Sequence, residues 1–201
     1  MKKGLMIVIS GPAGSGKGTV NSHLFETGNF VYSVSATTRA PRAGEVDGVN
    51  YHFISKEEFL ERISSGGMLE YTEYCGNYYG TPKKEAEEVL RSGKNLILEI
   101  EVEGAKNVKN KYPDAVLIML LPPSFATQEA RLRSRGTETE DKIRERLTRT
   151  REELKEIDCY DYIVYNRDGE DVRAAEEILA IVSAEQHTVR RNSDAAREYF
   201  S

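Results

Sequence analysis

Residues 5–25 read LMIVISGPAGSGKGTVNSHLF, and this stretch decides the fold. The apolar residues 5–10 are typical of a strand buried on both faces, and residues 19–25 favour a helix. The glycine-rich loop between them runs from Gly11 to Lys17, and its backbone N–H groups can turn toward a phosphate at the amino end of the helix. The sequence therefore predicts a strand, a phosphate-binding loop and a helix in direct succession.

The loop matches the G-x-x-x-x-G-K core of the Walker A motif, whose lysine reaches the β- and γ-phosphates of a nucleoside triphosphate. A glycine-rich turn that merely links strand to helix is the alternative. We expect the loop and the first helical residues to bind ATP through Gly11, Pro12, Ala13, Gly14, Ser15, Gly16, Lys17, Gly18 and Thr19. Gly18 stands where the motif has a hydroxyl ligand for Mg²⁺, so the ion is expected to rest on ATP phosphates and water. The loop motif therefore indicates a superfamily but does not identify the molecule that accepts the phosphate.

Composition narrows the class of partner. The formal net charge of −5 argues against a nucleic-acid or anionic-membrane partner, because both bind preferentially to basic protein surfaces. Cys75 and Cys159 lie far apart and form no zinc or disulfide pattern, and no apolar run of membrane-spanning length occurs. We expect a soluble cytoplasmic protein, and the sequence leaves its oligomeric state open.

Four short apolar runs predict strands buried on both faces, separated by helical patterns: residues 5–10, 95–100, 115–121 and 162–166. This alternation indicates an α/β fold in which helices cover both faces of a parallel sheet and ligands bind beyond the carboxyl ends of the strands.

Two segments interrupt the alternation. Residues 33–81 contain a helix predicted to begin at the capping box Ser55-x-x-Glu58. Residues 131–157 contain a second capping box, Thr137-x-x-Glu140, and four apolar residues predicted to share one helix face: Ile143, Leu147, Leu154 and Ile157. The first segment is interpreted as an inserted lobe and the second as a lid.

A block of arginines and tyrosines lies in the first insertion. It reads SATTRAPRAGE over residues 35–45, GVNY over 48–51, LE over 69–70 and GNYYGT over 76–81. Arg39 and Arg42 offer planar forks suited to a phosphate, and nearby tyrosine hydroxyls are neutral donors. With this block in place, the chain from the phosphate loop to Asn166 resembles the guanylate kinases.

The resemblance implies a P-loop NTPase three-layer sandwich with a parallel central sheet, an inserted GMP-binding lobe and a helical lid. It implies transfer of the γ-phosphate of ATP to GMP and dGMP, with Mg²⁺, in purine nucleotide metabolism and GMP recycling. We expect one domain over residues 1–187, with its core at 1–32, 83–124 and 158–187. The GMP-binding lobe is expected at 33–82, the lid at 125–157 and a flexible tail at 188–201.

The resemblance also assigns site residues. GMP would be bound by Ser35, Arg39, Arg42, Glu45, Tyr51, Glu70, Tyr79, Thr81 and Glu101. Catalysis would rest on Lys17, Arg39, Arg131, Arg135 and Arg146. Asn166 would lie on the adenine side of ATP.

Guanine presents N1–H and an amino group side by side, so a carboxylate flanked by hydroxyls complements it. Glu70 fits this role, with Ser35 and Thr81 facing O6, and an unpaired Glu70 would penalise adenine by about 2 to 4 kcal/mol. Thr81 also fits as the N-cap of a helix with Pro82 at its first position.

Glu99 and Glu101 are predicted on one side of the second strand's end, where they could organise the water shell of Mg²⁺. Salt bridges to the lid arginines are the alternative for both carboxylates. Arg149, by contrast, is interpreted as a surface charge.

Two other functions stay open at this point. One is a P-loop kinase that acts on another monophosphate or a ribose phosphate. The other is an inactive guanylate-kinase-like module that binds phosphopeptides, although such modules tend to lose the loop lysine.

Overall fold

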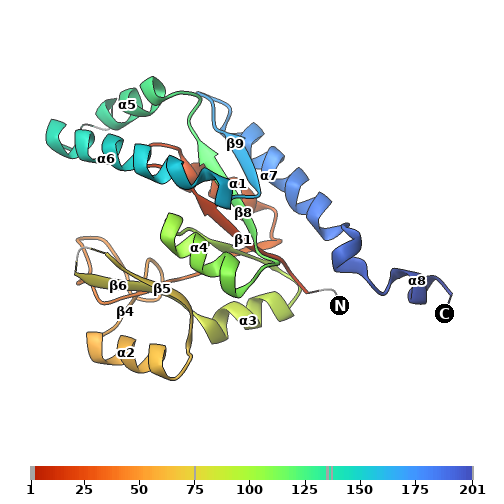
Figure 1. The fold of residues 1–201 in the computed structure, drawn as a ribbon. Coiled ribbons are helices and arrows are strands. Elements are labelled where there is room, and N and C mark those ends of the chain that lie inside the picture. Colours follow the sequence, from red (N-terminus) through yellow and green to blue (C-terminus); the bar gives the residue numbers. More distant parts are fainter. Residues whose placement is uncertain (1–2, 75, 135, 137, 201) are drawn as a thin grey trace.

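The computed structural model describes residues 3–74, 76–134, 136 and 138–200. Its centre is a five-stranded sheet of order β2-β7-β1-β8-β9 in which every neighbouring pair is parallel (Figure 1). The strands are β1 Met6–Ser10, β2 Phe30–Tyr32, β7 Asn95–Leu98, β8 Val116–Leu121 and β9 Tyr162–Tyr165. The predicted parallel sheet is confirmed, and β2 is a strand that the sequence analysis did not foresee.

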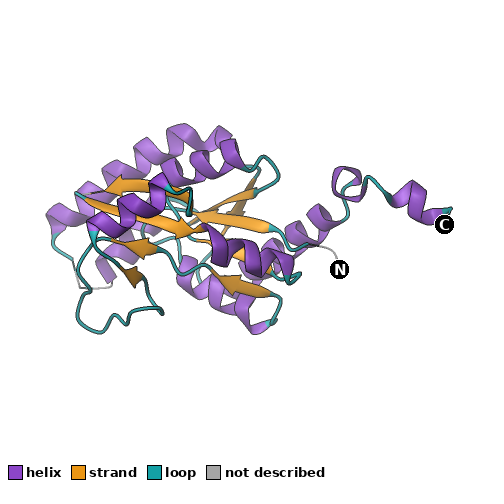
Figure 2. Cartoon of the chain, turned by 90° about the horizontal axis from the view of Figure 1, so that it is seen from below, coloured by secondary structure: helices purple, strands orange, loops and turns teal. Residues whose placement is uncertain are grey.

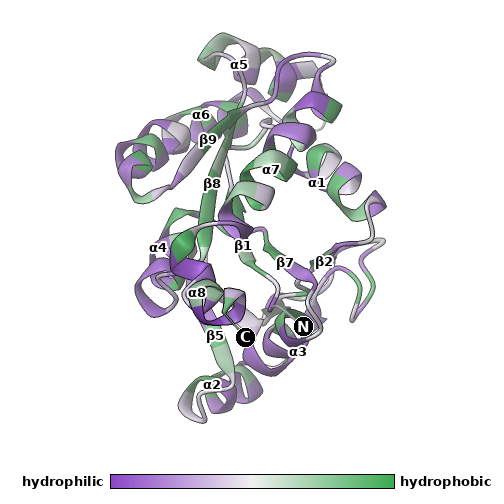
Figure 3. Cartoon of the chain, turned by 90° about the vertical axis from the view of Figure 1, so that its right-hand side faces the viewer, coloured by the Kyte–Doolittle hydropathy of each residue, from purple (hydrophilic) through white to green (hydrophobic). Residues whose placement is uncertain are grey.

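Helices cover both faces of this sheet because successive strand residues point to opposite sides. Ile7 and Ile9 face a core shared with α1 and α7, whereas Met6 and Val8 face a core shared with α3 and α4. The bounds of these helices are α1 Lys17–Glu26, α3 Lys83–Arg91, α4 Val102–Lys111 and α7 Asp171–Gln186. Figure 3 shows the apolar strands β1 and β8 running between helices that carry polar residues. The result is a three-layer α/β sandwich.

The first insertion forms a second sheet of order β4-β3-β6-β5. Its elements are β3 Ala36–Thr37, β4 His52–Phe53, α2 Lys56–Ser64, β5 Met68–Tyr74 and β6 Asn77–Pro82. The predicted cap of α2 is confirmed, since Ser55 Oγ accepts a hydrogen bond from the Glu58 backbone N–H at 3.1 Å. The alternative cap at Thr81 is wrong: Pro82 precedes α3 directly, and Thr81 still belongs to β6.

The second insertion contains α5 Phe125–Ser134, α6 Glu140–Glu153 and the 3₁₀ helix η1 Leu154–Cys159. Thr139 caps α6, where its side chain accepts from the Lys142 N–H, so the predicted cap at Thr137 is wrong; Thr137 itself lies outside the described residues. The four apolar residues predicted to share one helix face pack in two different places. Ile143 and Leu147 pack on α5, whereas Leu154 and Ile157 pack on the central sheet because the α-helix ends before them.

Beyond α7 the chain continues through η2 Val189–Asn192 and α8 Ala195–Tyr199. Polar contacts hold the start of this tail: Arg191 donates to Glu185 and to the Asp114 carbonyl oxygen. Tyr199 and Phe200 are 84% and 86% exposed, and Figure 2 shows this end projecting from the body. The flexibility of the tail stays a prediction.

In the part of the chain that the structure describes, no helix has the length and apolar character needed to span a membrane.

Candidate active site

The phosphate loop joins β1 to α1 at the carboxyl edge of the central sheet. Gly14 and Gly16 have φ values of 86° and 87°, which only glycine adopts without strain. Lys17 is the first residue of α1, and its Nζ donates to the Gly11 carbonyl oxygen at 2.5 Å. The loop and its lysine are therefore arranged around a helix N-terminus, as binding of a polyphosphate requires.

Asn166 supports this loop from behind. Its side chain is buried, and its Nδ2 donates to the Ser15 carbonyl oxygen at 2.9 Å. A Cβ on Gly16 would lie only 2.3 Å from this nitrogen, so glycine is required there for a second reason. The amide of Asn166 thus contacts the loop backbone, and its expected place on the adenine side of ATP stays a prediction.

Arg131 of α5 also contacts the loop. Its Nη1 donates to the Gly14 carbonyl oxygen at 3.2 Å, and its Nε and Nη2 both donate to Asp168. This predicted catalytic arginine thus lies against the backbone that would hold the phosphates.

Arg39 is oriented by Glu45 in the inserted lobe. Two hydrogen bonds of 3.0 and 2.9 Å join the guanidinium to the carboxylate, which also accepts from the Arg42 backbone N–H at 2.7 Å. The hydrogen bonds from Arg39 lower the pKa of Glu45, so the pair stays charged at neutral pH. Glu45 therefore orients Arg39, and its expected contact with GMP stays a prediction.

Two tyrosines complete this cluster. The Arg39 guanidinium lies 5.5 Å from the centre of the Tyr51 ring, and the rings of Tyr51 and Tyr79 meet edge to face at 6.1 Å. Burial raises the pKa of Tyr51, which keeps its hydroxyl protonated and able to donate. Arginine and tyrosine donors of this kind suit a phosphate monoester.

Glu70 is a buried carboxylate, only 2% exposed, on β5. Thr81 of β6 donates its hydroxyl to Glu70 Oε1 at 2.8 Å. Burial raises the pKa of Glu70, while the hydrogen bond from Thr81 lowers it. Thr81 was predicted to face O6 of guanine; in the structure its hydroxyl donates to Glu70, and its contact with guanine stays a prediction.

Glu99 and Glu101 have different partners. Strand β7 ends at Leu98, so the period-two argument that placed both carboxylates on one side of a strand does not apply. Glu99 accepts from Nδ2 of the buried Asn21 on α1 at 3.1 Å. Glu101 precedes α4 and pairs with Arg149 of the lid. For Glu101 the alternative of a salt bridge to the lid is thus observed.

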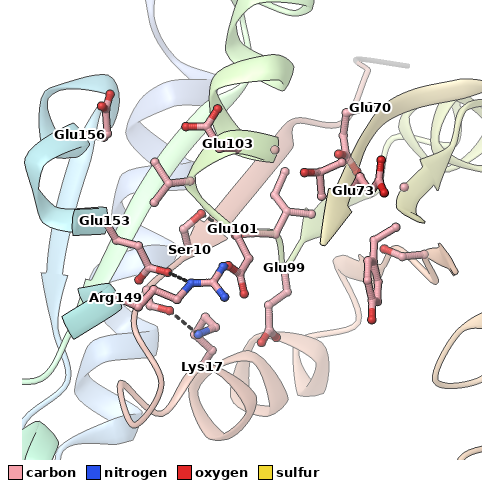
Figure 4. A pocket seen from close by; sticks show the side chains of 18 of the residues that line it. Ser10, Lys17, Glu70, Glu73, Glu99, Glu101, Glu103, Arg149, Glu153 and Glu156 are labelled. Carbon is pink, nitrogen blue, oxygen red and sulfur yellow. Dashed lines mark hydrogen bonds and ion pairs between the residues drawn. The ribbon is translucent and has the colours of Figure 1, made fainter. Parts of the chain in front are cut away.

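Arg149 of α6 lines the cleft, although the sequence analysis interprets it as a surface charge, and its side chain is 37% exposed. Its Nε donates to Glu153 at 2.9 Å, and Figure 4 shows its guanidinium turned into the cleft that Lys17 also lines. Arg146, the predicted catalytic residue, instead pairs with Glu138 at 2.7 Å and is 46% exposed. Arg135 lies outside the described residues. Arg149 and Glu153 lie four residues apart on a helix. This spacing is the only feature of the sequence that indicated a fixed position for the Arg149 side chain.

One cleft of about 740 Å³ joins these groups. Among the predicted site residues it is lined by Gly11, Lys17, Ser35, Arg39, Arg42, Glu45, Tyr51, Glu70, Tyr79 and Glu101, together with Glu99. Arg131, Arg146 and Asn166 are not among its lining residues. The cleft thus contains cations for phosphates, and a buried carboxylate.

Known proteins share this sequence and architecture. The family model described as guanylate kinase matches residues 3–184. A guanylate kinase from Halalkalibacterium halodurans is 53% identical over 185 residues, which cover 92% of this chain and 90% of the relative. One from Clostridioides difficile is 48% identical over 202 residues, covering 100% and 97%. The crystal structure of guanylate kinase from Anaplasma phagocytophilum is 34% identical, covers 95% of this chain and 90% of that one, and superposes with a TM-score of 0.75. The chain belongs to the guanylate kinase family.

Proposed function

We propose that this protein transfers the γ-phosphate of ATP to GMP, and to dGMP, giving ADP and the corresponding diphosphate. The observation that carries the proposal is the cleft itself, which joins the phosphate-loop lysine to a buried Glu70–Thr81 pair. The first group suits the donor nucleotide and the second suits guanine. Lys17 and Glu70 line one connected space, as direct transfer requires.

Base selection rests on Glu70. Guanine donates from N1 and from its exocyclic amine, and a carboxylate accepts both hydrogen bonds. Adenine has an acceptor at N1, so it would leave Oε2 of the buried carboxylate without a donor. Because Thr81 still donates to Oε1, the cost is about 1–3 kcal/mol, less than the 2 to 4 kcal/mol expected for a wholly unpaired Glu70. That cost corresponds to roughly 5- to 150-fold in selectivity. Thr81 holds the carboxylate in place, and Ser35 lines the same cleft.

The acceptor phosphate is assigned to Arg39, Arg42, Tyr51 and Tyr79. Glu45 fixes the plane of the Arg39 guanidinium through two hydrogen bonds, and Nη1 also donates to the Ala40 carbonyl oxygen. Arg39 held in this way lines the cleft. A fixed guanidinium places the attacking phosphate oxygen with little loss of entropy at the moment of reaction.

The donor phosphates are assigned to the loop from Gly11 to Thr19 and to Lys17. A phosphate oxygen of GMP forms a bond to the γ-phosphorus while the bond to the bridging oxygen of ADP breaks. The moving group carries negative charge, which Lys17 and the lid arginines would neutralise. We add Arg149 to these arginines because it lines the cleft. No general base is assigned, because the acceptor phosphate is already ionised at neutral pH.

The residues of the cleft are compatible with Mg²⁺ that binds together with ATP. No cluster of three or more histidine, cysteine or acidic side chains suits a metal ion within the described ranges. Glu99, steadied by Asn21, is an oxygen donor on the cleft wall that would hold water of the Mg²⁺ shell. The ion would supply charge neutralisation at the phosphates of ATP.

We also propose that the reaction takes place in the cytoplasm, as part of purine nucleotide metabolism. Cys159 is a free thiol, which fits a reducing compartment. The formal net charge of −5 gives no reason to add nucleic acid or an anionic membrane to the partners.

A coupled assay of ADP release tests the proposal with GMP, dGMP, IMP, AMP, CMP and UMP as acceptors. We expect kcat/KM to be highest for GMP, lower for IMP, which lacks the exocyclic amine, and close to background for AMP. Highest activity on AMP would refute the guanine assignment. Activity on none of the six would favour a binding module instead.

A further inference from the structure

We propose that Gly104 is a specificity-determining position, because its missing side chain leaves room for the Glu70 carboxylate that reads the base. The inference rests on the function proposed above and extends it to a residue that has no side chain. Gly104 is the third residue of α4 and is buried.

The approach between Gly104 and Glu70 is close. A Cβ at position 104 would lie 3.3 Å from Glu70 Oε2, and also 3.3 Å from Ile100 Cδ1. The other carboxylate oxygen, Oε1, is held by Thr81 at 2.8 Å. Oε1 of Glu70 is therefore held by a hydrogen bond, and a methyl group at position 104 would crowd Oε2.

Backbone conformation does not explain a glycine here. Unlike Gly14 and Gly16, Gly104 is not one of the glycines with positive φ, and its place in α4 is open to any helical residue. Inside a helix glycine is less favourable than alanine. Because it has no side chain, the glycine at this position allows β5 to approach α4 closely. A methyl group here would crowd two groups, and one of them is the carboxylate oxygen of Glu70.

A methyl group at position 104 should therefore displace the carboxylate by a few tenths of an ångström. Two hydrogen bonds from guanine depend on where this carboxylate lies, and hydrogen bonds weaken steeply when distance and angle depart from their optimum. The donor end of the cleft is built from other elements, so binding of ATP should be unaffected.

The test compares wild type, Gly104→Ala and the control Asn107→Ala, which gives the same helix a favourable alanine at an exposed position. We expect Gly104→Ala to raise KM for GMP roughly 10-fold and to lower the preference for GMP over IMP. KM for ATP should change less than twofold, and urea unfolding of the nucleotide-free protein should show no loss of stability. Asn107→Ala should match wild type in both KM values.

A double-mutant cycle separates repositioning of Glu70 from general damage. Glu70→Asp shortens the side chain and withdraws the carboxylate from position 104, so Gly104→Ala should cost much less in the Glu70→Asp background than in wild type. Should Gly104→Ala fail to fold, Ile100→Val in the same chain removes the Cδ1 atom that would be crowded and leaves the approach to Glu70 unchanged.

The outcomes are distinct. Wild-type KM and base preference in Gly104→Ala would overturn this inference alone. Equal losses for ATP and GMP with lower stability, or additive effects in the cycle, would assign Gly104 to packing and overturn it as well. Wild-type protein without activity on GMP would overturn the proposed function, and this inference with it.

Discussion

Replacement of Asn166 tests whether this residue supports the phosphate loop or binds the adenine of ATP. Asn166→Ala removes the hydrogen bond from Nδ2 to the Ser15 carbonyl oxygen and leaves a buried acceptor without that donor. Such a loss costs about 1–3 kcal/mol in the free energy of unfolding. For a chain of 201 residues this corresponds to roughly 2–12 °C in Tm. Asn166→Asp should lower the free energy of unfolding further, because a carboxylate oxygen would replace the amide donor that now faces the Ser15 carbonyl oxygen.

The assay is thermal and urea unfolding without nucleotide, followed by KM for ATP. We expect stability to fall in the order wild type, Asn166→Ala, Asn166→Asp, and KM for ATP to rise in the same order as the loop loses its support. An unchanged free energy of unfolding in both variants, with a raised KM for ATP, would refute the support role and return Asn166 to the adenine.

Three further predictions follow from single groups. Lys17→Ala should lower kcat by roughly 10³-fold and leave Tm unchanged, whereas a near-normal kcat would contradict the assignment of the loop. Arg149→Ala should lower kcat by roughly 10²-fold without altering the preference for GMP, and Arg144→Ala, which removes an arginine 75% exposed on the same helix, should have no effect; equal effects of the two would exclude Arg149 from the reaction. The hydrogen bond to Asp171 raises the pKa of His23 above 6.5, so the stability that the pair contributes is complete below pH 6.5 and is lost as pH rises through the raised value. The Tm difference between wild type and His23→Gln should therefore be larger at pH 6 than at pH 9, and an equal difference would show that protonation of His23 is irrelevant.

Local signals predicted much of the fold. The strand, loop and helix around Lys17 and the cap at Ser55 depend on contiguous residues, so sequence alone identified them. Strand β2 was missed because it has three residues and lies at the sheet edge, which leaves little apolar pattern to detect. Thr137 and Thr139 both precede a helical pattern, and the packing of α6 decided between them.

Helix α6 shows why the roles of arginines were harder to predict. Residues three apart on a helix point in directions that differ by about 60°, so Arg146 and Arg149 differ little in sequence terms. Which one faces the cleft depends on how α6 docks, and docking depends on apolar contacts made by other residues, such as Ile143 and Leu147 with Leu132. Arg149 turns inward toward Glu101, while Arg146 is held by Glu138. Rotation of a helix about its axis is a tertiary property that no local motif encodes.

Two glycines admit a polar side chain from a distant element. Gly16 makes room for Asn166 at the phosphate loop, and Gly104 makes room for Glu70 at the base. Neither pair includes a residue of α6, so the phosphate and base contacts are positioned independently of that helix. It follows that α6 variants such as Arg149→Ala should change the rate of transfer and leave base selectivity intact, whereas changes at Gly104 should do the reverse.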